Sequence, residues 1–130
     1  MKKLFVSVPM KGRTKEEIKA NIQKMKKIVE TLEGETLELI DSYIEDNPPK
    51  DGKEKIWYLG ESLKKLSQAD VFIGIDEIYV WKGCRIETNT AEAYGIKTYI
   101  IPVRYIIDDY DALVRKLYPS SNEAVERIIY

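Results

Sequence analysis

The chain has 130 residues, 21 lysines and arginines against 22 acidic residues, a net charge of -1 and no histidine. This length fits a single domain over residues 1–130, and a charge this close to zero predicts neither a nucleic-acid polymer nor an anionic membrane surface as partner. The absence of histidine excludes Ser-His and Cys-His nucleophile pairs and removes the commonest metal ligand. Acid–base chemistry then falls to carboxylates, tyrosines or lysines.

The expected compartment is the cytoplasm. Cys84 is the single cysteine and cannot form an internal disulfide. The first ten residues are too short an apolar stretch, soon interrupted by Lys11, for a secretory signal. No apolar run approaches the length that spans a membrane, so we expect no association with one.

The first part of the chain predicts a strand followed by a helix. Aromatic and β-branched residues over 2–8, stopped by Pro9, favour a strand. Thr14 followed by Glu17 is a capping-box pattern, and apolar residues at helical spacing predict a helix over 15–32.

The middle of the chain predicts a second strand over 36–41 and a long loop over 44–52, which contains two prolines and a glycine. An apolar stripe predicts a helix over 53–67, and a fully apolar run predicts a buried strand over 70–75.

The last part predicts a helix over 83–95 and a strand over 97–103. Residues 108–130 then form one or two closing helices, broken near Pro119. Strands that alternate with helices imply a mostly parallel sheet of four or five strands covered on both faces. The expected architecture is a Rossmann-like (flavodoxin-like) three-layer α/β sandwich.

In such sheets, ligands bind beyond the carboxyl ends of the strands. Three segments should meet there: residues 9–13, residues 76–84 and the helix that carries Glu87. Within the first, Gly12 permits a tight turn between Lys11 and Arg13, at a helix start that attracts anions. A phosphate or carboxylate site and a solvated basic turn both fit this pattern.

Glu87 lies in the first turn after Gly83 on this interpretation, where the helix dipole keeps a carboxylate ionised and nucleophilic. The same dipole accounts for a purely structural glutamate. Tyr79 and Trp81 either stack on a base or sugar or plug the edge of the domain. Cys84 is either a thiol of lowered pKa or a small buried residue.

Three stretches together resemble the nucleoside 2-deoxyribosyltransferase family, in particular its small phage and prophage branch. They are "GCRIETNTAEAYGIKTYII", "FVSVPMKGR" and "YLGESLKKLSQADVFIGI". The resemblance implies a Rossmann-like fold that binds a nucleoside or nucleotide and breaks its N-glycosidic bond without metal or cofactor. It implies that Glu87 attacks the anomeric carbon and that Gly12 and Arg13 hold a phosphate.

The chain departs from the family at the second carboxylate, which falls on Ser62 with Glu61 beside it. A serine is no general acid at neutral pH. Either Glu61, Asp76 or Glu77 substitutes, or the protein keeps the pocket and has lost the reaction. The two functional hypotheses are therefore an N-glycosidase or deoxyribosyltransferase and a non-catalytic binder that sequesters or senses a nucleotide-like molecule.

The candidate catalytic residues are Glu61, Ser62, Asp76 and Glu87. The candidate substrate-binding residues are Pro9, Met10, Lys11, Gly12, Arg13, Tyr79, Trp81, Gly83 and Cys84. Because the family commonly completes its pocket from a neighbour, and because the chain holds nine tyrosines, we also expect a homo-oligomer. Tyr99, Tyr105 and Tyr110 are candidates for its interface or for the core.

Overall fold

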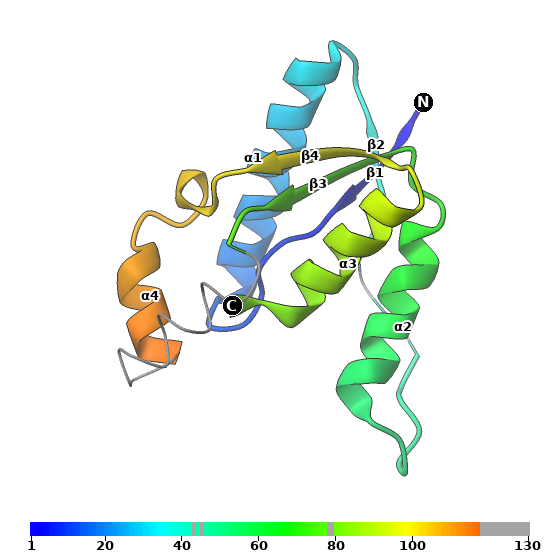
Figure 1. Cartoon of the computed structure of the whole chain (residues 1–130), viewed down its shortest axis with the longest axis vertical. Helices are drawn as coiled ribbons and strands as arrows, with labels where there is room; N and C mark the ends of the chain where they lie inside the picture. Colours follow the sequence, from blue (N-terminus) through cyan, green and yellow to red (C-terminus); the bar gives the residue numbers. More distant parts are fainter. Residues whose placement is uncertain (43, 45, 78–79, 118–130) are drawn as a thin grey trace.

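Four parallel strands form one sheet in the order β2-β1-β3-β4 (Figure 1). The computed structural model describes residues 1–42, 44, 46–77 and 80–117. Within them the strands are β1 (Lys3–Val6), β2 (Glu38–Leu39), β3 (Val71–Ile75) and β4 (Lys97–Ile101). The strand order places the reversal of the winding between β1 and β3, where ligands bind in doubly wound sheets.

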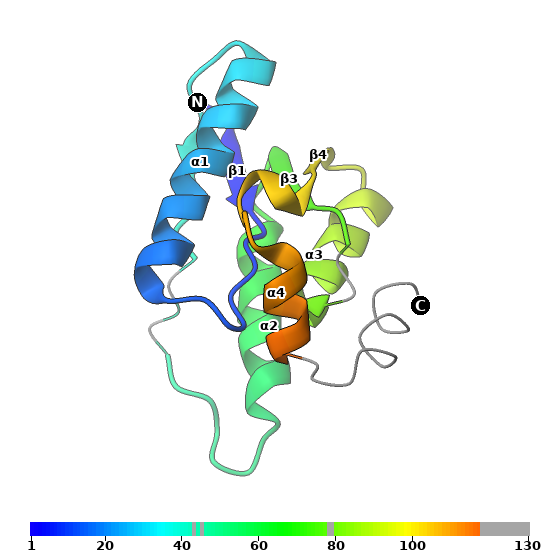
Figure 2. The same cartoon turned by 90° about the vertical axis from the view of Figure 1, so that its left-hand side faces the viewer.

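Helices cover both faces of this sheet, as Figure 2 shows from the side. Helices α1 (Lys15–Glu33) and α4 (Tyr110–Leu117) lie on one face, while α2 (Glu54–Leu66) and α3 (Lys82–Ala93) lie on the other. A short 3-10 helix, η2 (Val103–Tyr105), connects β4 toward α4. The predicted Rossmann-like α/β sandwich with a parallel sheet is confirmed.

Helix α1 begins and ends where local chemistry dictates. The backbone N–H of Thr14 donates to Glu17 Oε1 at 2.9 Å, and the N–H of Glu17 donates back to Thr14 Oγ1 at 3.2 Å. Gly34 then ends the helix in the left-handed region at φ 70°, which costs glycine little. The predicted capping box is therefore confirmed.

The strands are shorter than the sequence predicts. Strand β2 has two residues because it pairs with β1 alone and the chain leaves the sheet soon after Ile40 N–H donates to Leu4 O. Strand β4 ends at Ile101, because Pro102 has no N–H to continue a ladder and η2 follows. The proposed break near Pro119 lies outside the described residues.

Strand β3 occupies the centre of the sheet, with all five residues buried. A Cβ at Gly74 would stand 2.8 Å from the ring of Phe72 and 3.1 Å from the hydroxyl of Thr88. The missing side chain therefore lets α3 approach the sheet closely, which places the residue before Thr88 near the ends of the strands. None of the described helices combines the length and apolar character needed to cross a bilayer.

Candidate functional site

The carboxylate of Glu87 is held between two serine hydroxyls. Ser7 Oγ donates to Glu87 Oε1 at 2.7 Å, and Ser62 Oγ donates to Glu87 Oε2 at 2.5 Å. Ser7 follows β1, Ser62 belongs to α2 and Glu87 belongs to α3, so three separate elements supply this group. Both carboxylate oxygens therefore have a fixed direction, while each keeps a second lone pair for another partner.

Ser7 is a site residue that the sequence analysis missed. Its side chain is buried, and its N–H donates to Ile73 O at 2.9 Å, which extends the pairing of β1 with β3 beyond Val6. A polar side chain near the end of an otherwise apolar strand was the available indication, because buried polar groups need a partner. The partner is Glu87, 80 residues away along the chain.

The placement of Glu87 in the first turn of its helix is wrong. Helix α3 begins at Lys82 and its first turn holds no acidic residue, so Glu87 lies in the second turn. Burial raises the pKa of Glu87 above its ordinary value, while the hydrogen bonds from Ser62 and Ser7 act in the opposite direction. The serines, rather than the helix dipole, are what stabilise the ionised carboxylate.

This raised pKa predicts a pH-dependent effect of Glu87→Gln on stability. The folded state binds the Glu87 proton more tightly than the unfolded state, so stability is lost as pH rises above the unfolded value of 4.5 and through the folded pKa. Glutamine does not titrate. We expect the unfolding free energy of Glu87→Gln, relative to wild type, to increase with pH across this window in urea titrations.

The matched control is Glu92→Gln, because Glu92 is an exposed glutamate on the same helix. As a substitution at an exposed position, it should change the unfolding free energy by no more than about 0.5 kcal/mol. A Glu87→Gln difference that falls with rising pH would contradict the assignment of a buried carboxylate whose pKa is raised.

The other candidate carboxylates bond elsewhere. Glu61 forms a salt bridge with Lys64 at 2.8 Å. Asp76 accepts the N–H of Val103 at 2.8 Å and so fixes the start of η2. Glu77, at φ 52°, pairs with Arg104 at 3.2 Å. In the described part of the chain, the side chains that hydrogen-bond to Glu87 are serines.

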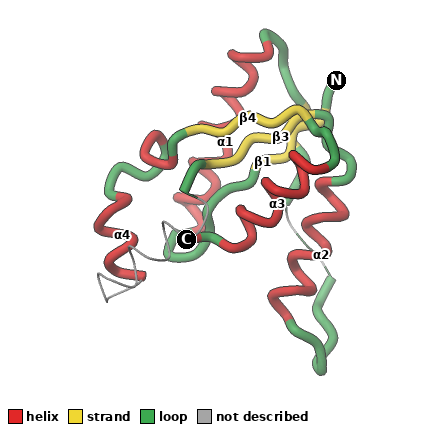
Figure 3. The backbone as a smooth tube through the Cα atoms, in the orientation of Figure 1, coloured by secondary structure: helices red, strands yellow, loops and turns green. Residues whose placement is uncertain are grey.

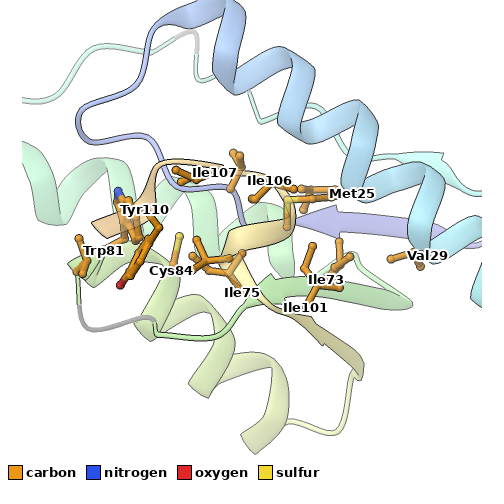
Figure 4. Close-up of a cluster of buried hydrophobic side chains, with 14 of the residues drawn as sticks. Met25, Val29, Ile73, Ile75, Trp81, Cys84, Ile101, Ile106, Ile107 and Tyr110 are labelled. Atoms are coloured by element: carbon orange, nitrogen blue, oxygen red, sulfur yellow. The ribbon is translucent and has the colours of Figure 1, made fainter. Parts of the chain in front are cut away.

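Trp81 and Cys84 are core residues (Figure 4). Trp81 is 4% exposed and packs against Tyr110 with ring centroids 6.1 Å apart. The prediction that Trp81 stacks on a ligand is therefore wrong, and the alternative, that it closes the edge of the domain, is confirmed. Burial raises the pKa of the Cys84 thiol to about 12, which excludes a reactive thiolate at neutral pH. Tyr79 lies outside the described residues.

The tyrosines proposed for an interface have different surroundings. Tyr110 belongs to the core of its own chain, so its assignment to an interface is wrong. Tyr99 donates its hydroxyl to Glu33 at 2.8 Å, and Tyr105 is 65% exposed. The homo-oligomer stays a prediction.

The loop after β1 meets the segment before α3, as expected, because Trp81 Nε1 donates to Lys11 O at 3.2 Å. Arg13 is not presented to solvent as a free cation: its guanidinium pairs with Glu17 at 2.9 Å and is largely buried. Pro9 is buried and Met10 is half exposed. Lys11 and Gly12 are exposed, so the loop keeps a solvated basic side at Lys11 while Pro9 and Arg13 pack against the rest of the protein.

Both the backbone conformation at position 12 and the small space around its Cα require a glycine in this loop. Its φ is 81°, and an added Cβ would stand 3.1 Å from side-chain carbons of Leu113 and Leu117 in α4. We expect Gly12→Ala to lower the unfolding free energy by about 1 to 3 kcal/mol. The control is Gly83→Ala, since nothing lies within 4 Å of a Cβ there.

Chemical denaturation measures both glycine variants. Gly83 lies inside α3, where alanine favours the helix, so Gly83→Ala should be neutral or stabilising by up to about 1 kcal/mol. Equal effects of the two substitutions would contradict the tight packing of Gly12 against α4.

A cavity of about 810 Å³ lies beside the site, at the carboxyl ends of β1 and β2. It opens where β2 stops after two residues, so it is bounded by α1 from one helical layer and α2 from the other. Its lining residues are Val6, Met10, Lys15, Ile18, Lys19, Ile22, Gln23, Leu39, Ile40, Asp41, Ser42, Ile44 and Tyr58. Of the residues predicted from the sequence, Met10 lines it.

Helix α2 links the cavity to the carboxylate, because Tyr58 lines the cavity and lies one helical turn before Ser62. Ser7, Ser62 and Glu87 are outside the lining, and Val6, which belongs to it, packs on the α1 side of the sheet while its neighbour Ser7 bonds to Glu87 on the other side. Gly83, near the start of α3, is exposed. Comparisons with protein-family models, with curated proteins and with solved structures found no match to this chain.

Proposed function

We propose that the protein breaks the N-glycosidic bond of a nucleoside or nucleoside 5'-monophosphate, as an N-glycosidase or deoxyribosyltransferase with Glu87 as nucleophile. The observation that carries the proposal is the carboxylate of Glu87, held by Ser7, the residue that follows β1, and by Ser62 of α2. The resemblance of the stretch that contains Gly83 and Glu87 to the nucleoside 2-deoxyribosyltransferase family supports the same role.

The reaction proceeds in two displacements at the anomeric carbon. An oxygen of Glu87 attacks this carbon while the C–N bond breaks, so the base leaves with the bonding electron pair and takes up a proton. The product is a glycosyl ester of Glu87. Water or a nitrogen of a second base then attacks the same carbon and loses a proton to solvent, while the bond between this carbon and the Glu87 oxygen breaks and the carboxylate is released.

Ser7 and Ser62 position the nucleophile and tune it. A carboxylate oxygen that accepts one hydrogen bond still has a lone pair for the anomeric carbon, so neither serine needs to leave before attack. Their hydrogen bonds favour the ionised form, which burial disfavours. Ser62 therefore acts as a positioning residue.

The alternative function is a non-catalytic binder of a nucleotide-like molecule. The absence, among the described residues, of a second candidate carboxylate bonded to Glu87 favours this alternative. Glu61 pairs with Lys64, Asp76 accepts the N–H of Val103, and Glu77 pairs with Arg104. Under the enzyme hypothesis, the proton for the leaving base then comes from solvent.

A single experiment separates the two functions. The protein is incubated with a panel of nucleosides and their 5'-monophosphates, free base is followed by chromatography, and intact protein is weighed by mass spectrometry. The enzyme hypothesis predicts released base and a transient mass increase that maps to Glu87. Ligand binding in calorimetry without any released base would establish the binder instead.

A further inference from the structure

The cavity between α1 and α2 is a candidate ligand site that the motifs do not identify. Its volume of about 810 Å³ lies within the range of small-molecule pockets, roughly 300 to 1,000 Å³. Apolar side chains from α1, β1 and the segment after β2 form much of its wall, and Tyr58 contributes an aromatic ring from α2. Figure 3 shows residues 46–53 running beside α2 and into the first turn of that helix.

The charges on its α1 wall favour an anionic ligand. Lys15 and Lys19 are four residues apart on α1 and both line the cavity, together with the apolar Ile18 and Ile22. Asp41, which follows β2, is the acidic residue of the lining, so the positive charge of the cavity is concentrated at its α1 wall. Lysine side chains at such positions lay their methylene stems along an apolar wall and place the ammonium group at its rim. A ligand with an apolar ring and a phosphate matches this combination.

Resting on the proposed function, we propose that this cavity binds the base and the 5'-phosphate of a nucleoside monophosphate, with Lys15 and Lys19 as the phosphate ligands. The base then lies among the apolar side chains beside Tyr58. This assignment moves the phosphate away from Arg13, whose guanidinium is paired with Glu17. The carboxylate of Glu17 would repel a phosphate at that position.

The stereochemistry of a nucleotide agrees with this placement. In a β-nucleoside 5'-monophosphate, the base and the 5'-phosphate lie on the same face of the sugar, and a nucleophile displaces the base from the opposite face. One cavity can therefore hold both groups while Glu87 faces the anomeric carbon from beyond Ser7 and Ser62. Glu87 and its two serines do not line the cavity, and the connection between them is Tyr58, which precedes Ser62 by one turn, about 5 to 6 Å along α2.

The test compares two double variants of the same helix. Lys15→Gln/Lys19→Gln removes the cavity charges, and Lys24→Gln/Lys27→Gln removes two exposed lysines of α1 that do not line the cavity. Calorimetry measures binding of the four 2'-deoxynucleoside 5'-monophosphates and of the four parent nucleosides. Circular dichroism confirms that each variant is folded.

We expect the cavity variant to bind its preferred monophosphate at least about tenfold more weakly, the loss for charged hydrogen bonds. Its affinity for the parent nucleoside should change less than about threefold, because the base and sugar contacts remain. The control variant should bind both as wild type does. Tyr58→Ala should weaken the monophosphate and the nucleoside alike, since both carry the base.

Equal monophosphate affinity in the cavity variant and wild type would overturn the inference, and so would wild-type protein that binds no monophosphate at millimolar concentration. Lysine-dependent binding without released base would support the cavity site and reject the glycosidase. Released base with an unchanged KM for the monophosphate in the cavity variant would reject the cavity site and retain the enzyme.

Discussion

Glu87→Gln is expected to reduce base release by roughly 10³- to 10⁶-fold, the range for removal of a nucleophile. Glutamine keeps the shape of the side chain, and its amide can still exchange hydrogen bonds with Ser7 and Ser62, whose hydroxyls both donate and accept. It lacks the negative charge that attacks the anomeric carbon. Ligand affinity should therefore change little, because a nucleophile acts mainly on the transition state.

Single-turnover kinetics with chromatography of the base measure this effect, and calorimetry measures the retained affinity. Glu92→Gln, on the exposed part of the same helix, should release base at the wild-type rate. Ser62→Ala should slow release less than Glu87→Gln, since it removes a donor and leaves the carboxylate. If Glu87→Gln and wild type release base equally fast, Glu87 is not the nucleophile.

Trp81→Ala is expected to lower the unfolding free energy by about 3 to 5 kcal/mol, the usual cost of truncating a buried aromatic residue. The indole is almost fully buried against Tyr110, and its N–H donates to the carbonyl of Lys11. Its removal leaves a cavity between α3, α4 and the loop after β1 and deletes the hydrogen bond to the carbonyl of Lys11. Urea unfolding followed by circular dichroism measures the change.

Trp81→Phe separates packing from the hydrogen bond. Phenylalanine fills most of the space but cannot donate to Lys11 O, so the loss should be smaller, with about 1 kcal/mol from the missing hydrogen bond. A loss below about 1 kcal/mol for Trp81→Ala would show that Trp81 contributes little to the core. If Trp81→Ala is less stable but still folded, its rate of base release can be compared with that of wild type. This comparison shows whether base release depends on the loop that Trp81 contacts.

Local patterns in the sequence determined the elements and the fold class. The exchange of hydrogen bonds between Thr14 and Glu17, and the glycine that ends α1, act over a few residues, so they can be predicted without the tertiary structure. The apolar run of β3 predicts a strand buried on both faces for the same reason. Alternation of such elements then implies the parallel sheet.

The surroundings of each functional side chain were decided by tertiary packing alone. Ser7 and Glu87 are 80 residues apart, and no spacing rule relates a strand end to the second turn of a later helix. The sequence analysis placed Glu87 under the helix dipole because it set the helix start near Gly83. The packing of α3 on the sheet instead partly buries the carboxylate and raises its pKa.

The same distinction explains Trp81 and the cavity. From the sequence, an aromatic residue in a loop can equally be a ligand-stacking residue or a core residue. The contact of Trp81 with Tyr110 shows that it belongs to the core. The pair of Arg13 and Glu17 differs, because it joins residues four apart at the start of α1 and is a local contact that the sequence spacing allows. The cavity is lined by residues of α1, of the segment after the two-residue strand β2, and by Tyr58 of α2, and these come together only through three-dimensional packing.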